Sequence, residues 1–160
     1  MIALQLNTRK PRLDSAELLR FTAQAQMAAR LRGDVGLCLT EDREMRALNR
    51  RFRRKNKPTD VLSFPASPDL NGYAGDLAIS LDIARANARR YGHSLAKEVK
   101  ILILHGLLHL AGYDHERDNG RMARMELKLR RELGLPDGLI ARTNAPVSKR
   151  KARAGKAGKR

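Results

Sequence analysis

The sequence predicts an α/β (α+β) fold: a single domain in which a small mixed sheet of four strands is covered by about five helices. Short strand-like stretches occur within the first 80 residues, and the pattern is helical from there to about residue 133. A length of 160 residues with 42% hydrophobic residues is enough to bury one core. The order of the strands does not follow from this pattern.

The chain begins with a strand and a helix. Residues 2–7 alternate between apolar and polar side chains, as a strand does when one face is buried. Asp14, followed three residues later by Glu17, forms a capping box that starts a helix reaching to about residue 31. Gly33 then ends this helix.

A second strand and helix come next. Residues 35–39 are expected to form the strand, and Thr40 is expected to cap the helix that follows it. Three apolar residues of that helix fall on one face, at positions i, i+3 and i+7: Met45, Leu48 and Phe52.

The second helix runs into a basic segment that ends at Pro58. Six of the eight residues from 50 to 57 are Lys or Arg. A solvated basic face of this kind holds nucleic acid through its phosphates. The residues expected to contact nucleic acid in this way are Arg50, Arg51, Arg54, Lys55 and Lys57.

Two more strands and three helices complete the domain. Residues 60–64 are expected to form a strand ended by Pro65, and residues 75–80 the fourth strand. Helices are predicted over about 81–91, 94–111 and 118–133. The last of these has Met122, Met125, Leu129 and Leu133 at helical spacing and is closed by Gly134 and Pro136.

Charge is the outlying property of the sequence. Lys and Arg number 33 against 17 Asp and Glu, which gives a formal net charge of +16. This excess predicts a polyanionic partner, with nucleic acid the first expectation and an anionic membrane surface the second. Residues 142–160 contain eight Lys or Arg and no acid. We therefore expect a domain over residues 1–141 and a disordered basic tail over residues 142–160.

A cytoplasmic location is expected. The single cysteine, Cys38, excludes an internal disulfide and fits a reducing compartment. Because it lies between two leucines of a strand, it is interpreted as a small packing residue rather than a nucleophile. The N-terminus lacks the basic start of a signal peptide, and no apolar run approaches the roughly 18 residues that a membrane helix needs.

Three of the four histidines fall within eleven residues, at the end of the most apolar predicted helix. His105 and His109 are four residues apart, so they share one face of the helix and can reach the same ion. Gly112 can adopt the left-handed conformation that ends a helix, which would let His115 turn back to complete the site. Core histidines bonded to backbone carbonyls are the alternative, but three at ligand spacing favour a metal.

This set of ligands predicts a catalytic zinc. Structural zinc usually has four protein ligands, whereas three imidazoles leave one position open for water or substrate. Zinc held in this way lowers the pKa of its bound water to about 7. The sequence does not fix the metal, because sites of three histidines also accept nickel, cobalt or iron.

The histidine spacing is also that of the metzincin proteases, with one difference. In those enzymes a glutamate after the first histidine is the general base, and here that position is Gly106. The metal ligands are kept but the base for peptide hydrolysis is absent. A metalloprotease is therefore the weaker expectation.

The residues at these positions resemble the YbeY family of bacterial metal-dependent endoribonucleases. Residues 105–115 fit the family pattern H-G-x-L-H-L-x-G-Y-D-H at every fixed position, and a second block lies between Leu48 and Pro65. Gly75-Asp76-Leu77 is similar to a third element, with Leu where Ile is usual. The similarity spans about residues 2–135.

The resemblance implies a single α/β domain, one zinc-like ion per chain on His105, His109 and His115, and cleavage of single-stranded RNA. It implies processing of the 3′ end of 16S rRNA and quality control of ribosomes. The expected partners are the small subunit and its assembly factors, and binding to DNA or to a membrane is not expected. It also implies an essential arginine, which is Arg53 here. Arg53 and His105 are the expected catalytic residues.

The chemistry of phosphodiester cleavage fits these residues, because a dication and a guanidinium both stabilise the negative charge that builds up on the phosphoryl oxygens. Two attacking groups are possible: a water activated at the metal, or the neighbouring 2′-hydroxyl. Attack by the 2′-hydroxyl would leave a 2′,3′-cyclic phosphate. Tyr113 is expected to pack or to stack on a base. The general base is also open; the acids near the motifs, any of which could instead orient a histidine, are Asp60, Asp76, Asp114 and Glu116. A ribosome-assembly factor without catalysis, in which the metal braces the fold, is the remaining alternative.

Overall fold

The structure is a computed structural model that describes residues 2–6, 13–54 and 59–136. Its centre is a four-stranded sheet in the order β1-β2-β4-β3. The strands β1 (Ile2–Leu6), β2 (Asp34–Thr40) and β4 (Tyr73–Ser80) are parallel to one another, and β3 (Val61–Pro65) pairs antiparallel with β4 at one edge. The predicted mixed sheet is confirmed, and its order is now known.

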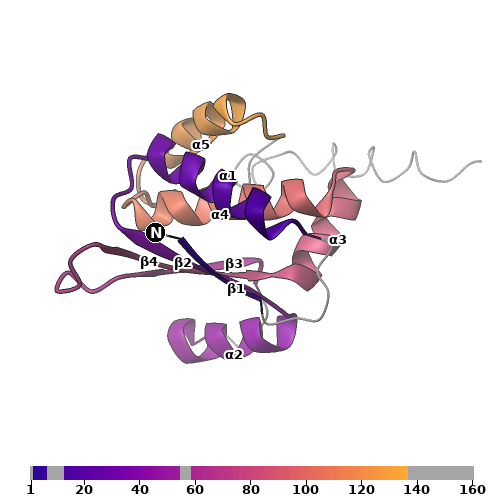
Figure 1. The fold of residues 1–160 in the computed structure, drawn as a ribbon, viewed down its shortest axis with the longest axis horizontal. Helices are drawn as coiled ribbons and strands as arrows, with labels where there is room; N and C mark the ends of the chain where they lie inside the picture. The colour runs from indigo at the N-terminus through magenta and orange to yellow at the C-terminus, as the bar shows by residue number, and fades with distance from the viewer. Residues whose placement is uncertain (1, 7–12, 55–58, 137–160) are drawn as a thin grey trace, which may run out of the picture.

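Within the described ranges, five helices cover this sheet on two sides. They are α1 (Ser15–Ala28), α2 (Asp42–Arg53), α3 (Leu81–Tyr91), α4 (Leu95–Leu110) and α5 (Arg121–Glu132). Figure 1 shows α1 and α4 side by side over one face, with α5 on their outer side, while α2 lies alone on the opposite face. The predicted fold class is confirmed.

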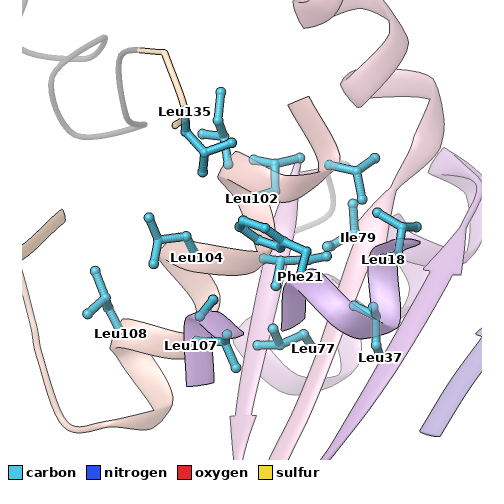
Figure 2. Close-up of a cluster of buried hydrophobic side chains, with 14 of the residues drawn as sticks. Leu18, Phe21, Leu37, Leu77, Ile79, Leu102, Leu104, Leu107, Leu108 and Leu135 are labelled. Atoms are coloured by element: carbon cyan, nitrogen blue, oxygen red, sulfur yellow. The ribbon is translucent and has the colours of Figure 1, made fainter. Parts of the chain in front are cut away.

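The main core lies between the sheet and α4. Nearly every residue of α4 from Glu98 to Leu108 is buried, as its almost continuous apolar sequence requires. In Figure 2, leucines from α4 face Leu37, Leu77 and Ile79 of the sheet and Leu18 and Phe21 of α1. The helix that carries two of the three clustered histidines is therefore buried in the main core over most of its length.

At Gly106, α4 packs closely against the sheet. A Cβ atom at this position would lie 2.7 Å from Cδ2 of Leu77, which is fully buried in β4. Only glycine lets the helix pack so closely. The residue after His105 is thus fixed by packing, and a glutamate there would have no room.

Of two predicted helix caps, one is present in the structure and the other is not. Asp14 caps α1 as expected, since its carboxylate accepts hydrogen bonds from the backbone N–H groups of Ala16 and Glu17. The Glu17 carboxylate instead pairs with Lys100 of α4. The prediction that Thr40 caps α2 is wrong.

The cap of α2 comes from another helix. Thr40 is the last residue of β2, and its hydroxyl donates to the Glu44 carboxylate. The helix begins at Asp42, whose backbone N–H donates to Asp82 Oδ2 of α3 over 2.9 Å. A cap from 40 residues away has no local signal in the sequence.

Two expectations concern residues at the limits of the described chain. The boundary near residue 141 and the basic tail of residues 142–160 lie outside the described residues. Within the described residues, no helix is both long and apolar enough to cross a membrane.

Candidate metal centre

His105, His109 and His115 converge on one point. One ring nitrogen of each lies within 4.8 Å of the corresponding nitrogens of the other two. The closest pair is His105 Nε2 and His109 Nε2, which are 3.1 Å apart. The ring centroids are 4.7, 5.5 and 5.3 Å apart for the pairs 105–109, 105–115 and 109–115. The grouping that the spacing predicts is therefore present.

The end of α4 brings the third histidine to the other two. The helix stops at Leu110, and the backbone N–H of Gly112 donates to the His109 carbonyl. Gly112 has φ +98°, a left-handed conformation that suits glycine. The chain then turns back, so that His115, which is exposed, faces the buried His105 and the half-buried His109.

Hydrogen bonds fix the orientation of two of the rings. His105 Nδ1 lies 2.8 Å from Glu126 Oε2, and His109 Nδ1 lies 3.0 Å from the Tyr113 carbonyl oxygen. Because both partners are acceptors, each Nδ1 carries the proton and donates it. The Nε2 atoms are left with lone pairs that point toward the centre of the cluster.

The geometry fits a divalent ion. Two lone pairs directed at each other over 3.1 Å repel unless a cation lies between them. Two tetrahedral zinc–nitrogen bonds of about 2.0–2.1 Å would place their nitrogens about 3.3–3.4 Å apart, close to this separation. The three histidines can therefore hold a metal ion.

The protonation of His109 favours the same conclusion. Burial lowers the pKa of its imidazole, and the nearby His105 and His115 lower it further. The Tyr113 carbonyl and Asp114 act in the opposite direction but more weakly. The ring is thus held in the neutral form, which is the form that binds metals.

Arg53 lies at the end of α2 and contacts the edge strand. Its Nη2 donates to the Ser63 carbonyl oxygen of β3 over 3.3 Å. The Ser63 hydroxyl in turn donates to the Gly106 carbonyl of α4 over 3.3 Å, one residue from His105. Through Ser63, the structure links the predicted arginine to the helix of the histidines.

Three other predicted RNA contacts, which the structure describes, come from the same end of α2 as Arg53. Arg50, Arg51 and Arg54 are all exposed. The Arg51 guanidinium lies over the Phe52 ring, 5.2 Å from its centroid, and Phe52 is itself 53% exposed. Two further predicted contacts, Lys55 and Lys57, lie outside the described residues.

Three of the four acids near the motifs accept hydrogen bonds from groups other than the histidines. Asp60 Oδ1 accepts from the Val61 N–H, and Asp114 Oδ1 from the Glu116 N–H, which makes Asp114 a turn residue. Asp76 accepts from the Tyr73 hydroxyl, and this hydrogen bond raises the pKa of Tyr73 to about 12. Tyr113 packs against the main core.

The carboxylate that orients His105 is that of Glu126, a residue that was not among the acids predicted from the sequence. It is 3% exposed and comes from α5, 21 residues after His105. The sequence contains one sign of this role. Glu126 lies on the apolar face of its helix, between Met122 and Leu129, where an acid needs a buried partner.

Comparisons with known proteins agree with the geometry. A family model described as endoribonuclease YbeY matches residues 5–134. A protein of Koribacter versatilis named endoribonuclease YbeY is 57% identical over 129 residues, which is 81% of this chain and 84% of that protein. One from Aquifex aeolicus with the same name is 45% identical over 119 residues, 72% of this chain and 78% of the relative.

A solved structure supports the fold. The solution structure of a Thermotoga maritima protein superposes with a TM-score of 0.56 at 27% sequence identity, and the match covers 100% of both chains.

Proposed function

This chain belongs to the endoribonuclease YbeY family, and on that premise we propose that it cleaves single-stranded RNA at a metal centre formed by His105, His109 and His115. It is an endoribonuclease, a hydrolase of RNA phosphodiester bonds. The observation that carries the proposal is the convergence of three imidazole nitrogens within 4.8 Å. Among the described residues, no Cys, Asp or Glu side chain joins this group as a fourth ligand.

Zinc is the metal that we propose for the three histidines. A zinc ion in such a site supplies a Lewis acid and a bound water of lowered pKa. Glu126 and the Tyr113 carbonyl keep the His105 and His109 rings in the required tautomer and orientation. His105, the more buried of the two, is held by a carboxylate and is the proposed anchor of the site.

Arg53 is the proposed partner of the scissile phosphate. A guanidinium has five N–H donors, of which the contact with Ser63 uses one. The remaining donors suit the phosphoryl oxygens, where negative charge increases during cleavage. Arg50, Arg51 and Arg54, with Lys55 and Lys57 beyond the described residues, are proposed to hold the RNA backbone.

The cellular task that we propose is the processing of the 3′ end of 16S rRNA on the small ribosomal subunit, in the cytoplasm. The domain of residues 1–141 would carry this activity, and the basic tail of residues 142–160 would be separate from it. Neither alternative function is favoured. Family membership argues against a protease and against an assembly factor without catalysis, and Gly106 leaves no base for peptide hydrolysis.

The test is a His109→Ala variant compared with His93→Gln, which changes the one histidine outside the cluster. We expect His109→Ala to lose bound metal and cleavage of single-stranded RNA, while His93→Gln keeps both. Metal content, far-UV circular dichroism and product analysis on a gel would be measured for each protein. If folded His109→Ala processes 16S rRNA normally in cells, the proposed centre is not the catalytic one.

A further inference from the structure

A second basic site lies beside the metal centre, on the other side of the turn that carries His115. A pocket of about 580 Å³ opens between the end of α1, the turn from residue 111 to 118, and α5. Four cationic side chains from these three parts of the chain line it: Arg30, Arg117, Arg121 and Lys128. We propose that this pocket binds the RNA strand next to the cleaved bond, an inference that depends on the endoribonuclease function proposed above.

Tyr113 belongs to both the pocket and the metal centre. Its carbonyl oxygen accepts the hydrogen bond from His109 Nδ1, and the residue also lines the pocket. The Arg121 guanidinium lies over the Tyr113 ring, 5.2 Å from its centroid. An RNA strand with a phosphate at the histidines therefore needs to cross only this turn to reach the four cations.

Each of the two acids of the pocket accepts a hydrogen bond from a nearby backbone N–H group. Asp114 Oδ1 accepts from the Glu116 N–H, and Asp118 Oδ2 accepts from the Met122 N–H at the start of α5. The ion pair of Arg117 with Asp114 spans 3.9 Å on exposed side chains and is therefore weak. The pocket presents four cations and two acids, a balance that suits an anionic ligand.

Arg30 adopts a backbone conformation that arginine disfavours. Its φ is +55°, in the left-handed region that glycine enters without steric strain. Its N–H donates to the Met27 carbonyl as α1 ends, and its exposed side chain lines the pocket. A left-handed residue directly after the C-cap is a common way to end a helix, and glycine at this position would keep the same backbone conformation.

Single-stranded RNA fits the remaining features of the pocket. Arginine forks bind phosphates through paired hydrogen bonds, and the apolar part of the lining supplies surface for a base or ribose. The apolar lining residues include Ala28, Ala29, Ala111 and Met125. An isolated phosphate would contact the cations but would not need this apolar surface.

The test uses the double variant Arg30→Gly/Arg121→Gln, with Arg89→Gln/Arg90→Gln as the matched control. The control removes two charges from exposed positions on α3, near the opposite end of α4 from His109. Binding of a fluorescent RNA of 20 nucleotides would be read by stopped-flow anisotropy before cleavage. We expect the pocket variant to bind about tenfold more weakly, with a salt-dependence slope smaller by about 1.4, and the control to change much less.

Two further measurements separate the outcomes. Arg30→Gly alone should keep or raise the melting temperature, since glycine relieves the backbone, while RNA affinity falls. The pocket variant should raise KM for the 20-nucleotide RNA but leave cleavage of a four-nucleotide RNA unchanged. Equal losses in the pocket and control variants would overturn the proposed pocket alone. Absence of RNA cleavage by the unmodified, metal-loaded protein would overturn the proposed function, and this inference with it.

Discussion

The buried carboxylate of Glu126 in α5 accepts a hydrogen bond from His105 Nδ1 in α4 over 2.8 Å. This hydrogen bond joins α5, the last helix among the described residues, to the metal centre.

We predict that Glu126 sets the metal affinity. Glu126→Gln should weaken metal binding about 10-fold to 100-fold, because the histidine loses a charged partner that raises its basicity. Glu126→Leu, which removes the acceptor altogether, should weaken it further. Competition with a chromogenic chelator would measure both. Glu132→Gln, an exposed acid at the end of the same helix, is the control and should bind as the unmodified protein does. Equal affinity in all four proteins would show that Glu126 only fills space.

The Arg53 guanidinium is expected to act on the reaction and not on the metal. Arg53→Ala should lower kcat by about 10²–10³, the loss seen when one donor to a developing oxyanion is removed. Arg53→Lys should recover little, since a point charge does not replace the planar fork. Bound metal should stay at the unmodified level. The neighbouring Arg50→Ala should mainly raise KM, and an Arg53→Ala variant that retains full kcat would exclude this role.

Gly106 should tolerate no side chain. A methyl group there would lie 2.7 Å from the fully buried Leu77, so Gly106→Ala should destabilise the protein by about 1–3 kcal/mol, although alanine favours a helix. Urea unfolding followed by circular dichroism would measure this change. In a double-mutant cycle with Leu77→Ala, the combined cost should be smaller than the sum of the two single costs. Strict additivity would mean that the two residues do not clash.

Cys38 should react slowly with alkylating reagents at neutral pH. Burial raises the pKa of its thiol, and the charges of Glu44 and Asp76 raise it further. Because the thiolate is the reactive form, a raised pKa means less thiolate at any given pH below it. The rate with iodoacetamide should rise about tenfold per pH unit and keep rising beyond the range where a free thiol, with a pKa of about 8.5, levels off. A plateau at or below that pH would contradict the assignment.

Local sequence patterns predicted most of the fold and the grouping of the three histidines. The alternation in β1, the Asp14 cap and the left-handed Gly112 are each decided by residues within a few positions of one another. The grouping of the three histidines is also a local feature, because one helix and one turn bring the rings together.

What the sequence missed depends on contacts between distant segments. The cap of α2 comes from Asp82, and the partner of His105 comes from Glu126. The position of Arg53 depends on Ser63, which bridges β3 and α4. Each of these contacts joins elements that only the tertiary fold brings together, which no local pattern contains.

The distance along the chain between His105 and Glu126 also matters while the protein is being made. Synthesis proceeds from the N-terminus, so all three histidines leave the ribosome before the carboxylate that holds the first of them. A nascent chain that ends before α5 therefore contains the three histidines but lacks the carboxylate of Glu126. With the role predicted for Glu126, the newly made protein reaches its full affinity for metal only after α5 has docked.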